Sequence, residues 1–207
     1  MDSASPLPIL LTAFEPFGGS TMNASLETAR NVSAMVPGVE VLELPVVSGL
    51  AETSVFDRLA DPRASQPSAM ISLGEAGPEP VVRLEWVYVN FDDFRIPDNA
   101  GLVRKASRIE ATGPAAYFAG IDLPGIVEEI GGRCPLPVVL SLSAGAFLCN
   151  HLAYAVSHRN PAIPYAFVHV PAWRPEESGF LLRDLVGTVA EILAAIRMRL
   201  SDDTLLR

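Results

Sequence analysis

Strand-like apolar runs alternate with helix-like amphipathic segments along the whole chain, and this order constrains the fold more than any other feature. Residues 7–14 form a continuous apolar run that ends beside a glycine pair, and a helical pattern follows Asn23. The order continues, with expected strands at 39–47, 69–77, 81–91, 136–147 and 163–173 and expected helices at 24–36, 48–61, 121–132, 149–159 and 176–200. Such alternation is typical of a three-layer α/β/α sandwich with a central, mostly parallel (mixed), twisted sheet.

The sequence predicts one domain over residues 1–207. The chain has 207 residues, of which 49% are hydrophobic, and this is enough for one large buried core. Residues 92–120 show no clear period, and an aperiodic stretch of this length in a compact domain is usually functional or mobile. We therefore expect a mobile flap over a binding site within 92–120.

Charge and hydropathy argue against two classes of partner. The formal net charge is −9 and no Lys/Arg stripe is present, so we expect no binding to nucleic acid. The apolar runs are too short or too amphipathic to span a membrane, and the N-terminal residues lack the positive region of a signal peptide. These features predict a cytoplasmic protein without a membrane partner.

The cysteine and carboxylate patterns predict neither a disulfide framework nor a metal site. The chain has two cysteines and no CxxC motif. The acidic stretch DDFRIPDN, which begins at Asp92, has none of the standard spacings of metal ligands. We expect no metal.

Cys149 is the strongest candidate for a nucleophile. It follows a strand and a Ser-Ala-Gly turn, at or near the start of a helix, where backbone N–H groups and the helix dipole favour a thiolate and can bind an oxyanion. The alternative is an inert buried cysteine, which is the commoner case for a cysteine taken at random. Cys134, in a GGRCPLP loop, fits that alternative better.

A nucleophilic thiol needs a base, and the chain offers three histidines. His151 is two residues from Cys149, an offset of about 200° on a helix, so the two side chains diverge. His158 lies more than two turns along the same expected helix, out of reach. By elimination His169, in an apolar strand, is the histidine that can meet Cys149, although a buried core histidine is an equally good interpretation.

Glu85 is the candidate for a carboxylate that orients the base. It interrupts an apolar strand, and a carboxylate inside a buried strand is costly unless it is paired. The alternative is that Glu85 lies on the wet face of the strand. Asp92, Asp93 and Asp98 compete for the same role.

Two aromatic residues flank a proline in the loop FEPFGG. Phe14 and Phe17 on a tight loop could clamp a small flat ring. The alternative is that both fill the core, and this alternative is stronger for Phe14, which ends a strand.

At these residues the chain resembles the pyroglutamyl peptidases, cysteine exopeptidases that remove an N-terminal pyroglutamate from peptides. The matching blocks occur in order and span nearly the whole chain: LLTAFEPFGGSTMNAS, GEAG, RLEWVYVNFDDFRIPDNAG, LSLSAGAFLCNHLAY and FVHVPAWRPE. The ordered combination of FEPFGG, RIPDN, SAGxxxCN and HVP is highly specific.

The resemblance implies a role for each matching residue. It implies that Cys149 is the nucleophile, His169 the base and Glu85 the third member of a catalytic triad. It also implies four substrate-binding residues: Phe14 and Phe17 around the pyroglutamyl ring, Asn23 in the matching loop, and Arg95 near the oxyanion. The family uses no cofactor, acts on pyroglutamyl peptides, and often assembles as homodimers or homotetramers.

Two departures from the family pattern leave other functions open. Glu75 stands where the family often has an uncharged residue, and Ala172 stands where an aromatic residue is common. A charge beside a neutral lactam keeps open a catalytically weak or inactive binder of pyroglutamyl ends or similar lactams. A thiol redox protein that uses Cys134 and Cys149 is a third interpretation, and the lack of CxxC argues against it.

Overall fold

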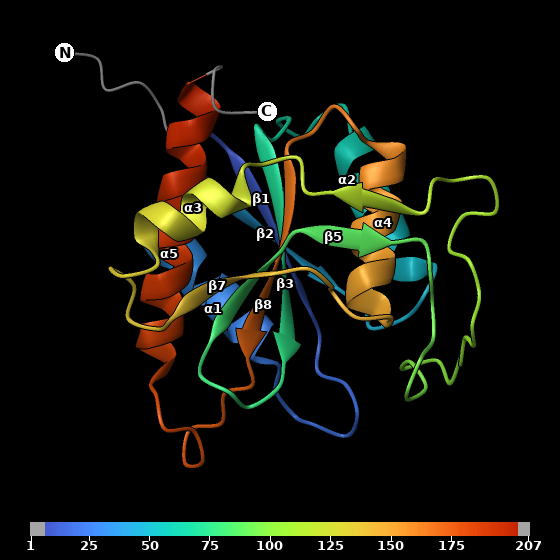
Figure 1. Ribbon diagram of the computed structural model, residues 1–207, viewed down its shortest axis with the longest axis horizontal. Coiled ribbons are helices and arrows are strands. Elements are labelled where there is room, and N and C mark those ends of the chain that lie inside the picture. Colours follow the sequence, from blue (N-terminus) through green and yellow to red (C-terminus); the bar gives the residue numbers. More distant parts are fainter. Residues whose placement is uncertain (1–6, 203–207) are drawn as a thin grey trace.

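A six-stranded sheet forms the middle layer of the computed structural model, which describes residues 7–202 (Figure 1). The strands lie in the order β2-β1-β3-β8-β4-β7. Their bounds are β1 (Ile9–Phe14), β2 (Val39–Leu44), β3 (Ala69–Ala76), β4 (Val82–Glu85), β7 (Val138–Ser141) and β8 (Tyr165–Pro171). The first four strands in this order run parallel, β4 runs antiparallel to β8, and β7 runs parallel to β4. The predicted mixed, mostly parallel sheet is confirmed.

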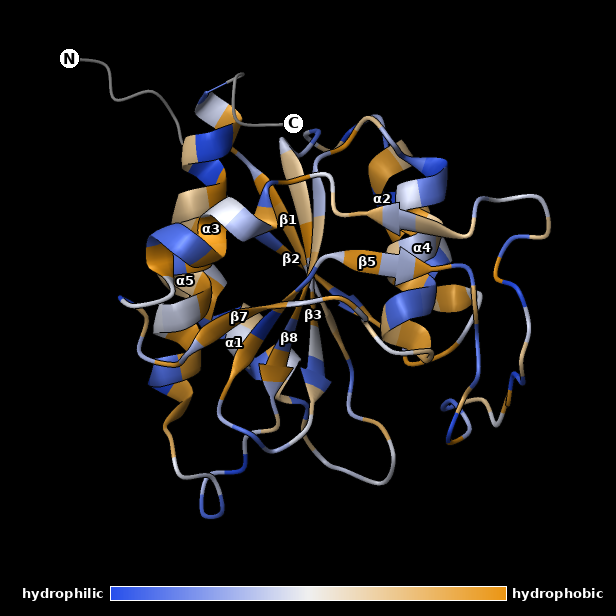
Figure 2. Ribbon diagram, in the orientation of Figure 1, coloured by the Kyte–Doolittle hydropathy of each residue, from blue (hydrophilic) through white to orange (hydrophobic). Residues whose placement is uncertain are grey.

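Helices cover both faces of the sheet, which confirms the three layers. One face carries α1 (Ala24–Met35), α3 (Leu123–Ile130) and α5 (Leu182–Ser201), and the other carries α2 (Leu50–Ala60) and α4 (Leu148–Arg159) (Figure 1). Figure 2 shows that hydrophobic residues concentrate in the central strands and on parts of the helices beside them. Among the helices described between residues 7 and 202, none is long and apolar enough to cross a membrane.

Side-chain alternation in β1 divides the core into two layers. Ile9 and Leu11 pack toward α1, α3 and α5, whereas Leu10 and Phe14 pack toward α2 and α4. Each of these side chains is at most 3% exposed. Burial of one such side chain is worth about 1.5–3 kcal/mol, so the strand is held firmly from both sides. A firmly held β1 fixes the start of the FEPFGG loop that follows it.

The predicted strand 81–91 is wrong as a single element, because the chain changes partner at Trp86. Before this residue β4 pairs with β8 and β7, and after it β5 (Val87–Val89) pairs with β6 (Ala116–Phe118) in a separate two-stranded sheet. The Trp86 N–H donates to Ser141 O over 2.7 Å and the Trp86 carbonyl accepts from Ala119 N over 2.9 Å. The alternation of side chains in a sequence does not show which strand each segment pairs with, so it could not reveal the break at Trp86.

The aperiodic segment 92–120 contains β6 and an irregular hairpin. Asp92 and Ser107 form a bridge at the base of the hairpin. Within the hairpin, Phe94 N–H donates to Arg104 O over 2.8 Å, and the Asp98 carboxylate accepts from the Leu102 N–H over 2.8 Å. The segment is therefore anchored at its base, while 99–103 are exposed. The predicted flap stays a prediction. Its least constrained backbone is 103–106, because the N–H groups of 99–102 donate to Val46 and Asp98.

Candidate active site

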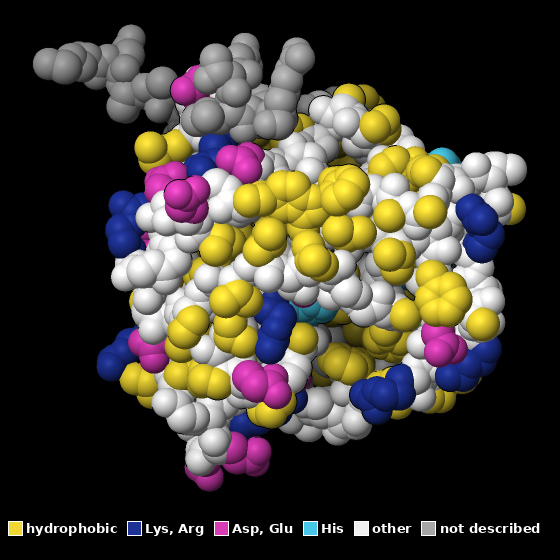
Figure 3. Space-filling view, in the orientation of Figure 1, with side chains coloured by type: hydrophobic (Ala, Val, Ile, Leu, Met, Phe, Trp, Pro, Cys, Tyr) yellow, Lys and Arg dark blue, Asp and Glu magenta, His cyan; other side chains and the backbone are white. Residues whose placement is uncertain are grey.

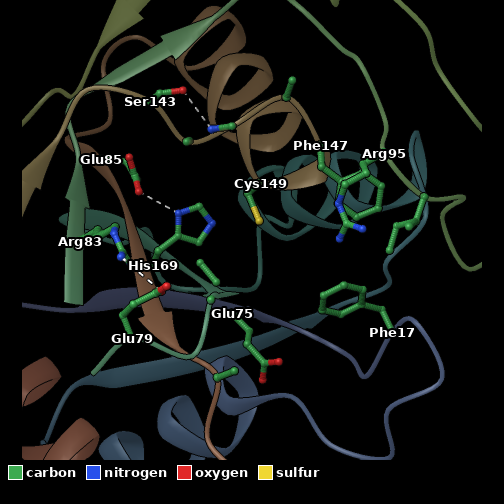
Figure 4. Close-up of a pocket in the computed structure, with 17 residues that line it drawn as sticks. Phe17, Glu75, Glu79, Arg83, Glu85, Arg95, Ser143, Phe147, Cys149 and His169 are labelled. Atoms are coloured by element: carbon green, nitrogen blue, oxygen red, sulfur yellow. Dashed lines mark hydrogen bonds and ion pairs between the residues drawn. The ribbon is translucent and has the colours of Figure 1, made fainter. Parts of the chain in front are cut away.

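Glu85 and His169 are brought together by the antiparallel pairing of β4 with β8. Glu85 ends β4 opposite Phe167, two residues before His169 on β8. The His169 Nδ1–H donates to Glu85 Oε1 over 2.8 Å, and the two residues are 7% and 1% exposed. Because Nδ1 binds Glu85, Nε2 on the opposite side of the ring can accept a proton, and Figure 4 shows the Cys149 sulfur on that side. The nucleophile, base and carboxylate expected from the sequence therefore share one site.

The surroundings of His169 stabilise its charged form. Burial alone lowers the pKa of the imidazole, but interactions with Cys149 and Glu85 outweigh it and raise the pKa to about 9. A histidine held this way accepts a proton readily and keeps the resulting imidazolium beside the sulfur.

Cys149 lies in the first turn of α4, which begins at Leu148 after Phe147. The backbone N–H groups at this position have no carbonyl partner within the helix, so they can donate to a developing oxyanion. On the sheet side the sulfur lies against Gly74 of β3. A Cβ at residue 74 would come within 3.0 Å of the sulfur and 2.8 Å of the Phe167 ring. The absence of a side chain at Gly74 thus makes room for the nucleophile, a requirement that the sequence analysis missed.

A cavity of about 520 Å³ opens over Cys149 and His169. Arg95 lines it, and in Figure 4 this side chain lies on the side of Cys149 away from His169. The hairpin that carries Arg95 is tied to the turn before α4, because Asp93 N–H donates to Ala146 O over 2.9 Å. Figure 3 shows a hollow on this face with a histidine beside it and charged side chains nearby.

A second, small cavity of about 50 Å³ adjoins the same cysteine. Phe14, Phe17 and Asn23 line it together with Cys149. Phe14 is 3% exposed and also belongs to the core, whereas Phe17 lines both cavities. The Asn23 side chain caps α1, because its Oδ1 accepts from the Ser25 N–H over 3.0 Å. The structure therefore brings three predicted substrate-binding residues together at one place.

Glu75 lines both cavities, but its charge is compensated. Its two carboxylate oxygens accept from the Arg174 guanidinium over 3.0 and 3.1 Å. Glu75 Oε2 also accepts from the Ala24 N–H over 2.6 Å, at the N-terminus of α1 where the helix dipole favours an anion. The sequence analysis missed Arg174, which lies in the matching block FVHVPAWRPE. Glu75 is therefore not an isolated charge beside the lactam, as the sequence had left open.

His151 belongs to a separate buried network. Its Nδ1–H donates to Asp92 Oδ2 over 2.8 Å and its Nε2–H to Glu52 Oε1 over 3.0 Å. Burial lowers the pKa of His151, but the two carboxylates outweigh it and raise the pKa to about 9. His158 Nδ1 lies 2.7 Å from the Tyr117 hydroxyl. The expected divergence of His151 from Cys149 is confirmed, and Asp92 orients His151 rather than His169.

The other candidates lie apart from this chemistry. Cys134 packs against the core on the α3 and α5 face, whereas Cys149 packs against the core on the α4 face. The sheet lies between the two cores, which argues against a Cys134–Cys149 disulfide. Asp98 binds backbone N–H groups, including that of Ser48 over 2.9 Å. Within residues 7–202, no group of three or more His, Cys, Asp or Glu side chains is placed to hold a metal ion.

Comparison with known proteins gives one consistent result. The family model for pyroglutamyl peptidase matches residues 7–178. A pyrrolidone-carboxylate peptidase of Chromobacterium violaceum is 38% identical over 201 residues, which cover 93% of this chain and 92% of that protein. Pyrrolidone-carboxylate peptidase 1 of Caldanaerobacter subterraneus is 38% identical over 175 residues, covering 83% of this chain and 85% of that one.

Solved structures agree with the sequence comparison. The crystal structure of pyroglutamyl peptidase I from Bacillus amyloliquefaciens superimposes with a TM-score of 0.83 at 29% identity, covering 93% of this chain and 98% of that chain. The pyrrolidone carboxyl peptidase of Thermococcus litoralis gives 0.82 at 26% identity, covering 95% and 96%. The chain belongs to the pyroglutamyl peptidase family.

Proposed function

We propose that this chain is a cysteine exopeptidase that hydrolyses the bond after an N-terminal pyroglutamyl residue of peptides, through a thioester acyl-enzyme. One observation carries the proposal: Cys149, His169 and Glu85 meet beside a small cavity lined by Phe14 and Phe17. A thiol, a base and an oriented carboxylate supply nucleophilic catalysis, and the aromatic cavity selects the acyl group.

Acylation begins when His169 takes the Cys149 proton. The thiolate attacks the carbonyl that joins the pyroglutamyl ring to the next residue, and the C–S bond forms while the carbonyl oxygen becomes an oxyanion. The His169 imidazolium then gives its proton to the leaving nitrogen as the C–N bond breaks. Glu85 holds the imidazole by Nδ1 and stabilises its cation, over the 2.8 Å bond between them.

Deacylation uses the same base. His169 removes a proton from water, the hydroxide attacks the thioester, and Cys149 leaves as the thiolate. The oxyanion of both steps is bound by backbone N–H groups at the start of α4, with Arg95 on the same cavity. Free pyroglutamate and the shortened peptide are the products.

Specificity follows from the neutral lactam. The ring nitrogen of pyroglutamate carries no charge, so the ring can enter the cavity lined by Phe14, Phe17 and Asn23. An ordinary N-terminus would bring an ammonium group into this apolar space, where it would lose hydration without a partner. Glu75 does not provide that partner because Arg174 already binds both of its oxygens.

We propose that the enzyme acts in the cytoplasm as a homodimer or homotetramer. A reducing compartment keeps a catalytic thiol from oxidation, and both cysteines are free. Exposed apolar side chains on β6 and after β7, Phe118 at 66% and Leu142 at 69%, support contact between copies of the chain. Sedimentation that gives the mass of a single chain at micromolar concentration would contradict the assembly.

The test of function is release of a fluorescent amine from a pyroglutamyl amide under reducing conditions. The matching prolyl and glutamyl amides are the specificity controls, and iodoacetamide is the thiol control. We expect turnover of the pyroglutamyl compound alone, abolished by alkylation. No turnover by folded protein with reduced Cys149 would support the alternative, a binder of pyroglutamyl ends without catalysis.

A further inference from the structure

Arg83 is a cation of the active-site cavity that the proposed mechanism does not use. It lies on β4 directly opposite His169 on β8. Opposite partners in antiparallel strands project from the same face of the sheet, with their Cβ atoms about 5 Å apart. Both side chains accordingly line the large cavity, and Figure 4 shows Arg83 beside the imidazole.

The position of His169 indicates which part of the cavity receives the leaving group. In Figure 4, Phe17 lies on one side of Cys149 and His169 on the other. The pyroglutamyl ring occupies the Phe17 side, and His169 must reach the leaving nitrogen. The residue after pyroglutamate therefore enters the part lined by His169, Arg83 and Glu79.

Glu79 is the ion-pair partner of Arg83, and the pair is loose. The Arg83 guanidinium lies 3.6 Å from Glu79 Oε2, and the two side chains are 28% and 64% exposed. Partly exposed ion pairs at this distance contribute about 0–1 kcal/mol, so another carboxylate can replace Glu79 at little cost. An arginine fork can bind the incoming carboxylate through two parallel hydrogen bonds.

The other charges of the cavity leave Arg83 as the cation nearest to the leaving group. Arg174 binds Glu75, and His169 binds Glu85. In Figure 4, Arg95 lies on the opposite side of Cys149 from Arg83 and His169. Since the chain as a whole carries a net charge of −9, it repels acidic peptides, and a preference for them requires a local cation.

We propose that Arg83 forms a binding subsite for a carboxylate of the leaving amino acid, an inference that rests on the proposed function. Two sources of this carboxylate share the same chemistry. One is an acidic side chain directly after pyroglutamate, and the other is the free C-terminus of a pyroglutamyl dipeptide.

Two pairs of substrates that differ only in one charge separate these sources. Pyroglutamyl-glutamate amide is compared with pyroglutamyl-glutamine amide, and pyroglutamyl-alanine with pyroglutamyl-alanine amide. The measurement is the ratio of kcat/KM within each pair. We expect a ratio of about fivefold in favour of the carboxylate in at least one pair, the size of one partly exposed charge-assisted contact. The pair that shows the preference identifies the source.

Three variants assign the preference to Arg83. Arg83→Gln should bring the ratio to about one, and Arg83→Lys should restore part of it because it keeps the charge. Glu79→Gln should raise the ratio because it removes the competing carboxylate. The matched control is Arg63→Gln, whose side chain is 88% exposed and paired with Asp61 outside the cavity, and it should leave the ratio unchanged.

The outcomes separate failure of the inference from failure of the function. Wild-type turnover with no preference in either pair overturns the subsite alone, as does a ratio that Arg83→Gln or Glu79→Gln leaves unchanged. An equal shift in Arg63→Gln would assign the preference to overall charge and overturn the subsite as well. Absence of turnover of any pyroglutamyl substrate by the wild type overturns the proposed function, and the subsite with it. If Arg83→Gln is inactive toward all four substrates, Glu79→Gln provides the test. A higher kcat/KM ratio in Glu79→Gln supports the subsite, and an unchanged or lower ratio overturns it.

Discussion

At the residue scale, the Glu85 carboxylate and the His169 imidazolium stabilise each other. Glu85 is 1% exposed, and one of its oxygens, Oε2, has no hydrogen-bond partner among residues 7–202. A buried carboxylate with so few partners is costly unless a cation faces it. The imidazolium of His169 is that cation, so the pair is most stable in the state that follows proton transfer from Cys149.

Glu85→Gln removes this charge and keeps the shape of the side chain. We expect kcat for a pyroglutamyl amide to fall by about 10³-fold, since the amide can still accept from His169 but no longer stabilises its cation. The melting temperature should change by only a few degrees. If the variant instead unfolds at the assay temperature, Glu85 has a structural role and the triad assignment loses its third member.

The two cysteines provide a matched pair of substitutions. Cys149→Ser should abolish measurable turnover with the fold intact, because a serine hydroxyl beside the same base is a far weaker nucleophile. Cys134→Ser, on the other face of the sheet, should retain wild-type kcat/KM. Circular dichroism checks the fold of each variant, and equal loss of activity in both would contradict the assignment of Cys149.

At the element scale, the His151 network joins three parts of the fold. It links α4 to Glu52 on α2 and to Asp92 at the base of the hairpin that carries Arg95. Arg104, on the other arm of that hairpin, lies 3.4 Å from Asp92. The network therefore fixes the hairpin against the helix that carries the nucleophile.

This network predicts a dependence of stability on pH. The pKa of His151 is about 9 in the folded protein and ordinarily about 6.5, so its contribution is fully present below pH 6.5 and is lost as pH rises through 9. We expect the free energy of unfolding in urea to fall by on the order of 2 kcal/mol more in wild type than in His151→Gln between these limits. His169 titrates in the same window in both proteins, so the difference isolates His151. Equal slopes would contradict a charged His151.

The flap prediction concerns the hairpin and can be tested by hydrogen exchange. Residues 99–106 are mostly exposed, whereas Asp92 and Phe94 donate backbone hydrogen bonds at the base over 2.8 Å each. The backbone N–H groups of 103–106 have no hydrogen-bond partner among residues 7–202, so we expect fast exchange there in the free enzyme and slower exchange when 2-pyrrolidone is added. Uniformly strong protection over 92–120 without ligand would contradict a mobile flap.

Elements could be predicted from the sequence where their periodicity is local. The order of strands and helices and the mostly parallel sheet could be predicted from apolar runs, and elimination among three histidines was enough to select His169 as the partner of Cys149. The pairing of Glu85 with His169 was implied only by the resemblance to the family. The break at Trp86 and the three-residue strand β6 were not, since both depend on a change of strand partner. The helix expected from 176 begins at Leu182, after a turn in which Arg174 N–H donates to Ser178 Oγ over 2.8 Å.

Ion pairs between segments that are distant in the sequence could not be predicted from it. Glu75 and Arg174 lie 99 positions apart, as do His151 and Glu52. No spacing rule relates such residues, and only the folded chain brings them together. Glu75 therefore looked like an unpaired charge beside the substrate, although it is compensated.

At the scale of the whole molecule, the chain is strongly acidic but the carboxylates of its active site are compensated. The chain carries a net charge of −9, yet each of the carboxylates Glu75 and Glu85 in its site faces a cation. An acyl cavity without an unpaired charge suits a neutral lactam and disfavours an ammonium group. We therefore expect Cys149 to be acylated only by a substrate whose ring is neutral.

Covalent labelling with a pyroglutamyl chloromethyl ketone, mapped by peptide mass spectrometry, tests whether Cys149 reacts only after a neutral ring has bound. The reagent places a reactive carbon next to the nucleophile only after its ring has bound, and the prolyl analogue, which carries an ammonium group, is the matched control. We predict one label per chain, on Cys149, with the prolyl reagent slower by at least about 100-fold, the cost of burying an unpaired ammonium group. Labelling of Cys134, equal rates for the two reagents, or no labelling of folded, reduced enzyme would contradict selection of a neutral ring by the Cys149 site.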